Sequence, residues 1–300
     1  MPKLPLSARV LRFMLRNSIP GQTRLLYAMA NRMSSLQAVP VTFADRPAVY
    51  VDLRSGQGWV WLRGSPWSTV PDEPDEQQLI QRIVRPEDVV YDIGANIGLY
   101  TSLFSRLASK VVAFEPNPGL LRTLRLTTAN LANVKIVPVA LADTDGNATL
   151  YVPNDHTMGS LADYTGSEEL LEWKERIGLT AAETVQCETS TLDSLIAAGL
   201  PLPDFIKCDV EGAEFLVFRG AQKTLASAGA PFVLFEVLEM CSSGFGVDKL
   251  AAAKFLEELG YSLFDVGPRG NLRPMVPSPH RVNVLAIPPG RIAALGDLLN

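Results

Sequence analysis

Residues 89–101 read Val-Val-Tyr-Asp-Ile-Gly-Ala-Asn-Ile-Gly-Leu-Tyr-Thr. The β-branched and aromatic residues at 89–93 are typical of a buried parallel strand. The chain then turns through Gly94 and Gly98 into a helical pattern of leucines. Glycine lets a backbone approach a ligand closely, and a helix N-terminus offers N–H groups that have no intrahelical partner. The stretch therefore predicts a strand, a turn and a helix that bind the polar part of a nucleotide-like ligand.

The spacing of the two glycines distinguishes between classes of nucleotide site. A dinucleotide site has the pattern G-x-G-x-x-G, in which the second glycine lets the pyrophosphate approach. Asn96 stands at that position here, and no Lys-Ser or Lys-Thr pair follows to form a P-loop. A smaller ligand with a carboxylate and a nucleoside fits better, and S-adenosylmethionine is such a ligand. An ordinary tight turn between a strand and a helix is the alternative.

The composition is that of a globular protein, because 47% of the residues are apolar and can form a full core. The net charge of −5 argues against a nucleic-acid partner. Three cysteines without metal-site spacing indicate reduced thiols, and we expect a cytoplasmic location. No apolar run reaches the roughly 18–20 residues of a membrane span. Arginines interrupt any apolar core of a signal peptide near the start of the sequence.

Residues 1–44 carry six basic residues and no acidic residue. Arg9, Arg12 and Arg16 fall on one face of a predicted helix, and a second helix follows it. One interpretation is a weak peripheral contact of residues 1–33 with a membrane or an acidic partner. The alternative, which we favour because basic helix faces are usually just solvated, is a pair of helices that covers the main domain.

The next part of the chain changes from helical to β-rich patterns. Residues 38–43, 48–53 and 59–62 are short β-rich runs between turn residues, and they predict a small antiparallel meander. A helix is predicted from Asp75 to Val84. We expect a helical and β extension over residues 1–84, packed on the core. The main domain is then residues 85–300, with an insert at 153–183.

From residue 88 onward, strands alternate with helices, which predicts an α/β fold with a parallel, doubly wound sheet. The predicted strands cover residues 89–93, 110–115, 134–139, 148–152, 204–209, 231–236, 261–265 and 281–287. Only a Gly/Pro-rich loop at 267–279 joins the last two strands, so we expect these two to pair antiparallel. A Rossmann-like sheet that is mostly parallel with an antiparallel C-terminal strand is similar to the class I methyltransferase architecture.

An acidic residue stands at or just after the end of each predicted core strand. These residues are Asp92, Glu115, Asp143, Asp209 and Glu236. Sheets of this kind bind ligands beyond the carboxyl ends of their strands. Glu115, about 20 residues after the glycine turn, could accept hydrogen bonds from both ribose hydroxyls. Asp143 could accept one from an adenine amino group, and Asp92 one from the amino end of a methionine moiety. A helix cap or a surface charge is the alternative for each.

Four runs together resemble the FkbM family of S-adenosylmethionine-dependent methyltransferases. They are Tyr-Asp-Ile-Gly-Ala-Asn-Ile-Gly at 91–98, Phe-Glu-Pro-Asn at 114–117, Thr-Leu-Asp-Ser-Leu at 191–195 and Ile-Lys-Cys-Asp-Val-Glu-Gly-Ala-Glu at 206–214. The resemblance implies a class I fold, S-adenosylmethionine as cofactor and O-methylation of a hydroxyl on a natural product or sugar. The predicted cofactor-binding residues are Asp92, Gly94, Ala95, Asn96, Gly98, Glu115, Pro116, Asn117, Ala142 and Asp143.

A base within hydrogen-bond reach of the acceptor hydroxyl would help methyl transfer by roughly 10²–10⁴-fold. Asp209 is the favoured candidate, because it ends the central strand where donor and acceptor should meet. Glu211 and Glu236 are predicted close to it, and the three carboxylates could share a proton or hold Mg²⁺. His156 in the insert is a further catalytic candidate, with a solvated loop histidine as the alternative. Lys207 is expected to pair with an acid.

Two other functions remain open from the sequence alone. An NAD(P)-dependent oxidoreductase or epimerase would share the fold, but the missing glycine at 96 and the absence of a Tyr-x-x-x-Lys pair argue against it. A non-catalytic, membrane-associated binding protein would dock through the basic N-terminal residues, but the intact acids at the strand ends argue against that. We therefore expect a methyltransferase with a small-molecule or saccharide acceptor.

Overall fold

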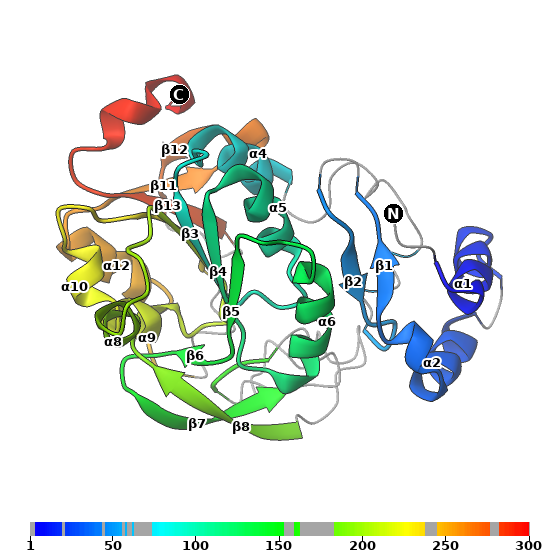
Figure 1. Ribbon diagram of the computed structural model, residues 1–300. Coiled ribbons are helices and arrows are strands. Elements are labelled where there is room, and N and C mark those ends of the chain that lie inside the picture. The colour runs from blue at the N-terminus through cyan, green and yellow to red at the C-terminus, as the bar shows by residue number, and fades with distance from the viewer. Residues whose placement is uncertain are drawn as a thin grey trace.

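A computed structural model describes residues 4–19, 22–43, 46–55, 58, 62, 74–152, 159–162, 183–237, 245–276 and 282–299. Figure 1 shows a twisted central sheet with helices on both faces, a smaller sheet at its lower edge and the N-terminal elements to one side. This layered arrangement is the α/β fold class that the alternation of strands and helices predicts.

Within the described residues, the main sheet has eight strands. They are β3 (Val89–Ile93), β4 (Lys110–Phe114), β5 (Val134–Val137), β9 (Phe205–Cys208), β10 (Phe232–Val237), β11 (Ser262–Val266), β12 (Leu272–Pro274) and β13 (Val282–Ile287). Their order is β12-β11-β13-β10-β9-β3-β4-β5. The five strands from β5 to β10 are parallel, and β13 lies antiparallel between β10 and β11. The predicted antiparallel pairing at the C-terminal end is confirmed, while β12 lies in a stretch that we expected to be a loop.

The path of the chain across the main sheet reverses next to β3. From β3 the chain moves through β4 to β5, and it then returns to β9 and β10 on the other side of β3. Open parallel sheets bind ligands at such a switch point, beyond the carboxyl ends of the strands. Strands β3 and β9 pair in parallel, and Asp92 of β3 stands opposite Lys207 of β9. Both side chains therefore lie on the same face of the sheet, at the end where a ligand would bind.

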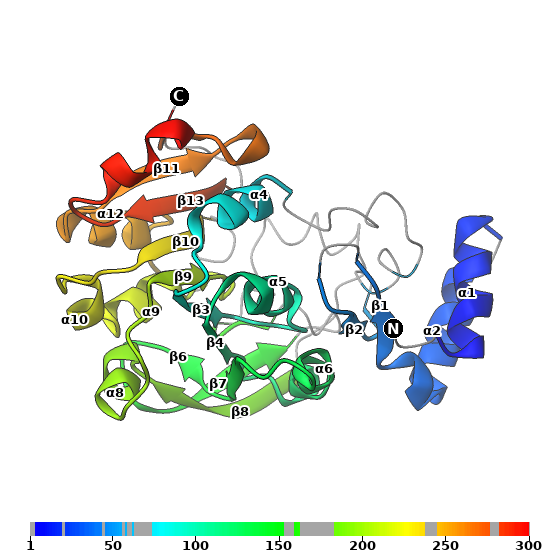
Figure 2. The same cartoon turned by 45° about the horizontal axis from the view of Figure 1, so that its top comes forward.

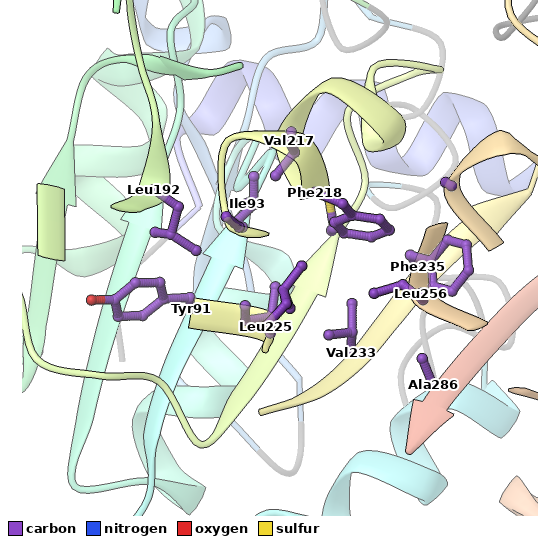
Figure 3. Close-up of a cluster of buried hydrophobic side chains, with 14 of the residues drawn as sticks. Tyr91, Ile93, Leu192, Val217, Phe218, Leu225, Val233, Phe235, Leu256 and Ala286 are labelled. Carbon is purple, nitrogen blue, oxygen red and sulfur yellow. The ribbon is translucent and has the colours of Figure 1, made fainter. Parts of the chain in front are cut away.

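Helices cover both faces of the main sheet. They are α4 (Pro74–Ile83), α5 (Leu99–Leu107) and α6 (Pro118–Thr128) on one face, and α8 (Leu192–Ala197), α9 (Glu214–Arg219), α10 (Gln222–Leu225) and α12 (Ala251–Glu258) on the other. Figure 3 shows the cluster under the second group, where the rings of Phe218 and Phe235 meet edge to face at 5.3 Å. Fully burying side chains of this size contributes about 1.5–3 kcal/mol each, so the clusters fix the strand ends rigidly.

A second sheet corrects the predicted third core strand. That strand was expected to run over residues 134–139, but β5 ends at Val137 and the chain passes to another sheet after Pro138. Proline has no N–H to donate to a strand ladder. The second sheet contains β6 (Ala140–Leu141), β7 (Gly146–Val152) and β8 (Glu183–Ser190), in the order β6-β8-β7. We did not predict β8, because its sequence is almost entirely polar.

The N-terminal elements pack against the start of α5. They are α1 (Leu6–Arg16), α2 (Gln22–Arg32), β1 (Val39–Val41) and β2 (Val49–Val51), and the two strands pair antiparallel. Leu11 and Leu26 are fully buried in one cluster with Ile97 and Leu99. The division of the chain at residue 84 stays a prediction. None of the helices in the described ranges has both the length and the apolar character needed to cross a membrane.

Some predictions fall on residues that the structure does not describe. Residues 59–61 of the expected third β-rich run lie outside the described residues, and so does most of the insert predicted at 153–183. His156, the histidine candidate for catalysis, is in that part of the insert.

Candidate active site

The turn between β3 and α5 has three residues in the left-handed region. Their φ angles are +79° at Gly94, +54° at Asn96 and +89° at Gly98. A Cβ at position 94 would lie 1.8 Å from the carbonyl oxygen of Asp209, and one at position 98 would lie 2.9 Å from Leu124. We expected these glycines to make room for a ligand, and the structure shows that both make room for protein atoms. The turn is thereby pressed against the end of β9 and against α6.

Backbone hydrogen bonds fix the same turn to β4. The N–H groups of Gly94 and Ala95 both donate to the carbonyl oxygen of Phe114, at 3.1 and 2.9 Å. The N–H of Gly98 donates to the carbonyl of Ala95 at 2.8 Å and closes the turn. The turn therefore has a fixed shape beyond the carboxyl ends of β3 and β4.

Glu115 follows β4 directly and bridges two loops. One carboxylate oxygen accepts the N–H of Asn96 and the other accepts the N–H of Asn117, both at 2.8 Å. The side chain is buried, and burial raises its pKa to about 7 in spite of the two backbone hydrogen bonds, which act in the opposite direction. Each carboxylate oxygen has two lone pairs, so the group has acceptor capacity beyond these two bonds.

Asn117 forms the N-cap of α6. Its side-chain oxygen accepts the N–H of Gly119 at 2.9 Å, and Pro118 stands at the first helical position. Asn117 thus positions the helix, while its own N–H binds Glu115. Pro116 lies between Glu115 and Asn117 in the loop that joins β4 to α6.

Asp92 is a buried carboxylate with one oxygen that has no hydrogen-bond partner. Thr101 Oγ1 donates a short hydrogen bond to Asp92 Oδ2, while Oδ1 has no partner among the described residues. Burial raises the pKa of Asp92, and the ammonium of Lys207 and the Thr101 hydroxyl partly oppose that shift. A buried acceptor without a donor is costly, so this oxygen is a natural contact point for a ligand that carries N–H groups.

Lys207 and Asp209 form an ion pair beside Asp92. The ammonium lies 2.8 Å from Asp209 Oδ2 and 4.4 Å from the centre of the Tyr100 ring. The Lys207 side chain is 6% exposed and that of Asp209 is 28% exposed, so the carboxylate faces outward from a buried cation. The expectation that Lys207 pairs with an acid is confirmed. Asp209, the favoured base, can be reached from solvent.

The acids near Asp209 have different surroundings. Glu236 is buried in β10, on the same face of the sheet as Lys207 because Leu234, two residues earlier, stands opposite that lysine. Glu214 is buried and accepts the N–H groups of Val210 and Gly212 at 3.0 and 3.4 Å. Burial raises its pKa to about 7. Glu214 therefore stabilises the turn before α9.

Glu211 lies in the turn that Glu214 closes, with a positive φ of 53°. Its carbonyl oxygen accepts a hydrogen bond from Ser160 Oγ at 2.9 Å. Among the described residues, no three His, Cys, Asp or Glu side chains are arranged to hold a metal ion. The ammonium of Lys207 occupies the position beside Asp209 that a metal cation would take. The structure therefore does not support a Mg²⁺ site at these carboxylates.

Asp143 follows a strand of the second sheet, not the third strand of the main sheet as expected. Its carboxylate forms an ion pair with Arg219 at 3.1 Å, and the two side chains are 23% and 52% exposed. The backbone of Ala142 is in contact with Gly220, where a Cβ would lie 2.0 Å from the Ala142 carbonyl oxygen. This contact holds the loop after β6 against the end of α9.

The described part of the insert connects the two halves of the site. Ser160 pairs through its backbone with Tyr151 and donates its hydroxyl to the turn at Glu211. Gly159 approaches the side chain of Asn117, with 3.8 Å between its Cβ position and Nδ2. Residues 159–162 thus lie between the start of α6 and the turn that follows β9.

The family model for the methyltransferase FkbM domain matches residues 92–263, which is more than half of the chain. The chain belongs to the FkbM methyltransferase family. The matched residues include the turn, Glu115, the Lys207–Asp209 ion pair and β10. They leave out α1, α2, β1 and β2.

This FkbM family protein is also similar in sequence to three named relatives. It is 28% identical to hexuronic acid methyltransferase AglP of Haloferax volcanii over 190 residues, which are 62% of this chain and 68% of AglP. It is 29% identical to 2-O-methyltransferase NoeI of Sinorhizobium fredii over 154 residues, which are 50% of this chain and 63% of NoeI. It is 27% identical to AMB antimetabolite synthetase AmbE of Pseudomonas aeruginosa over 287 residues, which are 86% of this chain but 13% of AmbE.

A solved structure also matches, namely the methyltransferase FkbM of Methylobacillus flagellatus KT. The match has a TM-score of 0.43 and 15% sequence identity, and it covers 77% of this chain and 54% of that chain.

Three residues of this FkbM family site were not found from the sequence. Thr101 and Tyr100 lie in the first turn of α5, where side chains of a helix point back toward the preceding strand end. Their place at the start of the helix that follows this strand end could have indicated the contact. Ser160 gave no such signal, because its contact with the turn at 211 depends on how the insert folds back.

Proposed function

We propose that this FkbM family protein transfers a methyl group from S-adenosylmethionine to a hydroxyl group of a saccharide or secondary metabolite. The observation that carries the proposal is the pair of buried carboxyl groups at the ends of β3 and β4. Asp92 keeps one oxygen without a donor, and Glu115 holds the turn with acceptor capacity to spare. Both fit a ligand that brings several hydrogen-bond donors.

The cofactor fits the residues of this edge by chemical type. Asp92 Oδ1 would accept a hydrogen bond from the ammonium of the methionine part, and Glu115 would accept the two ribose hydroxyls. The turn at residues 94–98 would lie against the cofactor, and Asp143 would accept the adenine amino group. When bound, S-adenosylmethionine supplies a methyl group on a positively charged sulfur, and nearby carboxylates favour that charge.

Asp209 is the residue that we propose to accept the proton of the acceptor hydroxyl. Its carboxylate is oriented by the buried Lys207, which the ring of Tyr100 covers. A hydroxyl bound in hydrogen-bond contact with Asp209 would be both positioned and made more nucleophilic. Glu211 and Glu236 are secondary candidates for the same role, because they lie at the same edge of the sheet.

The names of two relatives support a saccharide acceptor. AglP is named for a hexuronic acid and NoeI for methylation at a 2-O position. A sugar presents several hydroxyls of similar chemistry, so an enzyme that selects one of them must fix the ring as well as the reacting oxygen. The described insert segment at 159–162 is suited to such a contact, because it lies beside both the start of α6 and the turn at Glu211.

Calorimetric titration with S-adenosylmethionine, S-adenosylhomocysteine and NAD(H) tests the cofactor. We expect the first two to bind and NAD(H) to fail. Glu115→Ala should weaken the binding of S-adenosylmethionine by about 10²-fold, because hydrogen bonds to a charged group contribute about 1.5–3 kcal/mol each. The exposed Glu258 on α12 offers a matched control, and Glu258→Ala should leave affinity unchanged.

Incubation with labelled methyl donor and a panel of saccharides and alcohols tests the reaction. The expected product carries the label on oxygen, as product analysis by mass spectrometry and NMR would show. Tight binding of NAD(H) in place of S-adenosylmethionine would refute the proposal, and so would transfer of the label to nitrogen or carbon acceptors only.

A further inference from the structure

Helix α1 has two apolar stripes, and only one of them is used by the fold. Ala8, Leu11 and Leu15 are buried, with exposures of 0%, 0% and 7%, and they join the cluster that includes α2 and Leu36. This stripe attaches α1 to the rest of the protein and accounts for one face of the helix.

The second stripe is exposed. Leu6, Val10 and Phe13 are 74%, 49% and 64% exposed, although burial of such side chains is strongly favourable. At about 100° of rotation per residue, the centres of the two stripes lie about 170° apart on the helix. The exposed stripe therefore points directly away from the protein interior. Residues at spacings of four and three lie on one face of a helix, so these three side chains form a continuous apolar surface.

The exposed stripe has positive charge along one side. Arg9 and Arg16 are exposed and lie about 65–90° from its centre. Arg12 lies further round the helix and is half-buried; burial and the nearby charge of Arg16 lower its pKa. No acidic residue occurs in residues 1–44, so the charged side chains of this segment are all positive.

The position of α1 in the molecule leaves this face accessible. In Figures 1 and 2, α1 and α2 lie at the end of the molecule away from the main sheet, and β1 and β2 lie between them and the core. The exposed stripe of α1 is thus far from the proposed cofactor site, and its role is separate from catalysis.

We propose that the exposed stripe of α1 docks on the surface of an anionic lipid bilayer, with the helix lying in the plane of the membrane. The apolar side chains would enter the interfacial region, and Arg9 and Arg16 would lie at the level of the negative headgroups. The helix has 11 residues and is therefore about 16 Å long, which suits a surface contact and is too short for a span. A second copy of this chain is a poorer partner, because pairing two α1 helices would bring like charges together.

Vesicle flotation of the full chain tests this proposal. The vesicles contain phosphatidylcholine alone or phosphatidylcholine and phosphatidylglycerol in equal parts. We expect flotation with the anionic vesicles only, and weaker flotation as salt rises. Val10→Glu with Phe13→Glu should lower the partition coefficient by about 10²-fold or more. Arg9→Gln with Arg16→Gln should lower it by about 30-fold on anionic vesicles.

Leu202 provides a matched control, because it is a 53% exposed leucine outside α1. Leu202→Glu should float like the unchanged protein, and all variants should keep their circular dichroism spectrum and their affinity for S-adenosylmethionine. Failure of the unchanged protein to float with anionic vesicles would overturn the proposal. An equal loss with Leu202→Glu would overturn it too, and so would a dimer in solution that the α1 variants dissociate while vesicles are not bound.

Discussion

Replacing Glu115 by glutamine separates the charge of this side chain from its position. In the structure, each carboxylate oxygen accepts one backbone N–H at 2.8 Å, from Asn96 and from Asn117. A glutamine amide has the same shape but only one acceptor oxygen, so one of the two N–H groups would face an NH₂ group. Leaving that buried donor unsatisfied costs about 1–3 kcal/mol of stability.

The raised pKa of Glu115 sets how stability depends on pH. Burial raises this pKa from 4.5 to about 7. Between these values the folded protein keeps a proton that the unfolded chain has released, so the free energy of unfolding falls as pH rises. The loss is about 1.4 kcal/mol per pH unit, or about 3 kcal/mol from pH 4.5 to pH 7. Glu214, whose pKa is also raised to about 7, adds a loss of the same size. Glu115→Gln should therefore remove its own share, about 1.4 kcal/mol per pH unit, from the slope between pH 4.5 and pH 7.

Cofactor binding should act on the same group in the opposite direction. Hydroxyl donors to Glu115 favour its charged form, so S-adenosylmethionine should lower the pKa of this carboxyl and release a proton below pH 7. The affinity of the unchanged protein should then rise with pH up to about 7, by about tenfold for each unit by which the pKa falls. In the Glu115→Gln protein, the part of this pH dependence that comes from Glu115 should be absent.

Two measurements test this reasoning. Urea unfolding at several pH values between 5 and 8 gives the slope, and calorimetry in buffers of different ionisation enthalpy gives the number of protons released on binding. Glu214→Gln is the matched control, because it should lower the slope of stability by the same amount but leave proton release on binding intact. The reasoning is refuted if Glu115→Gln keeps the full slope. Equal loss of proton release in the two variants would refute the assignment of ribose binding to Glu115.

Four further substitutions give distinct outcomes. Asp209→Asn should leave S-adenosylmethionine binding intact and slow methyl transfer by about 10²–10⁴-fold in single-turnover assays, and an unchanged rate would remove Asp209 as the base. Gly94→Ala should prevent stable folding, because its Cβ would lie 1.8 Å from the carbonyl of Asp209. Gly290→Ala, at a nearly identical φ of +78° but in open space, should cost only about 1–2 kcal/mol in thermal unfolding, and equal effects would contradict the packing role of Gly94. Asp143→Asn should change stability by less than about 1 kcal/mol, because its ion pair with Arg219 is partly exposed. The same variant should weaken cofactor binding in calorimetry, and an unaffected affinity would argue against an adenine contact.

The sequence predicted those parts of the fold that strong local patterns determine. The strand at 89–93, its glycine turn and the antiparallel pairing of the C-terminal strands follow from periodicity, from turn residues and from the length of one connection. The strand β8 could not be found in this way. Of its eight residues, Val185 and Cys187 alone are apolar, and its partner β7 precedes it by an insert of about 30 residues.

The candidate site was predictable in position but not in its internal contacts. The carboxyl ends of parallel strands meet at one edge of the sheet, independently of side-chain conformation. Asp92, Glu115 and Asp209 could therefore be placed together. Their hydrogen-bond partners depend on how the neighbouring loops close. The sequence does not show that Asn96 donates to Glu115, or that Lys207 lies between Asp209 and the ring of Tyr100.

The contacts of the turn at residues 94–98 imply that its shape depends on the N-terminal elements. Three residues of the turn adopt left-handed conformations, and Asn96 is the one among them that has a side chain. The turn keeps this shape because β4, β9 and α6 hold it from three sides. Ile97 and Leu99, within and just after it, are buried in the cluster that also holds α1 and α2. Thr127 Oγ1 donates to the carbonyl of Ile97 and accepts the N–H of Tyr50, which connects β2 to the turn as well. Elements outside the residues matched by the family model thus contribute to the shape of the loop that we assign to the cofactor.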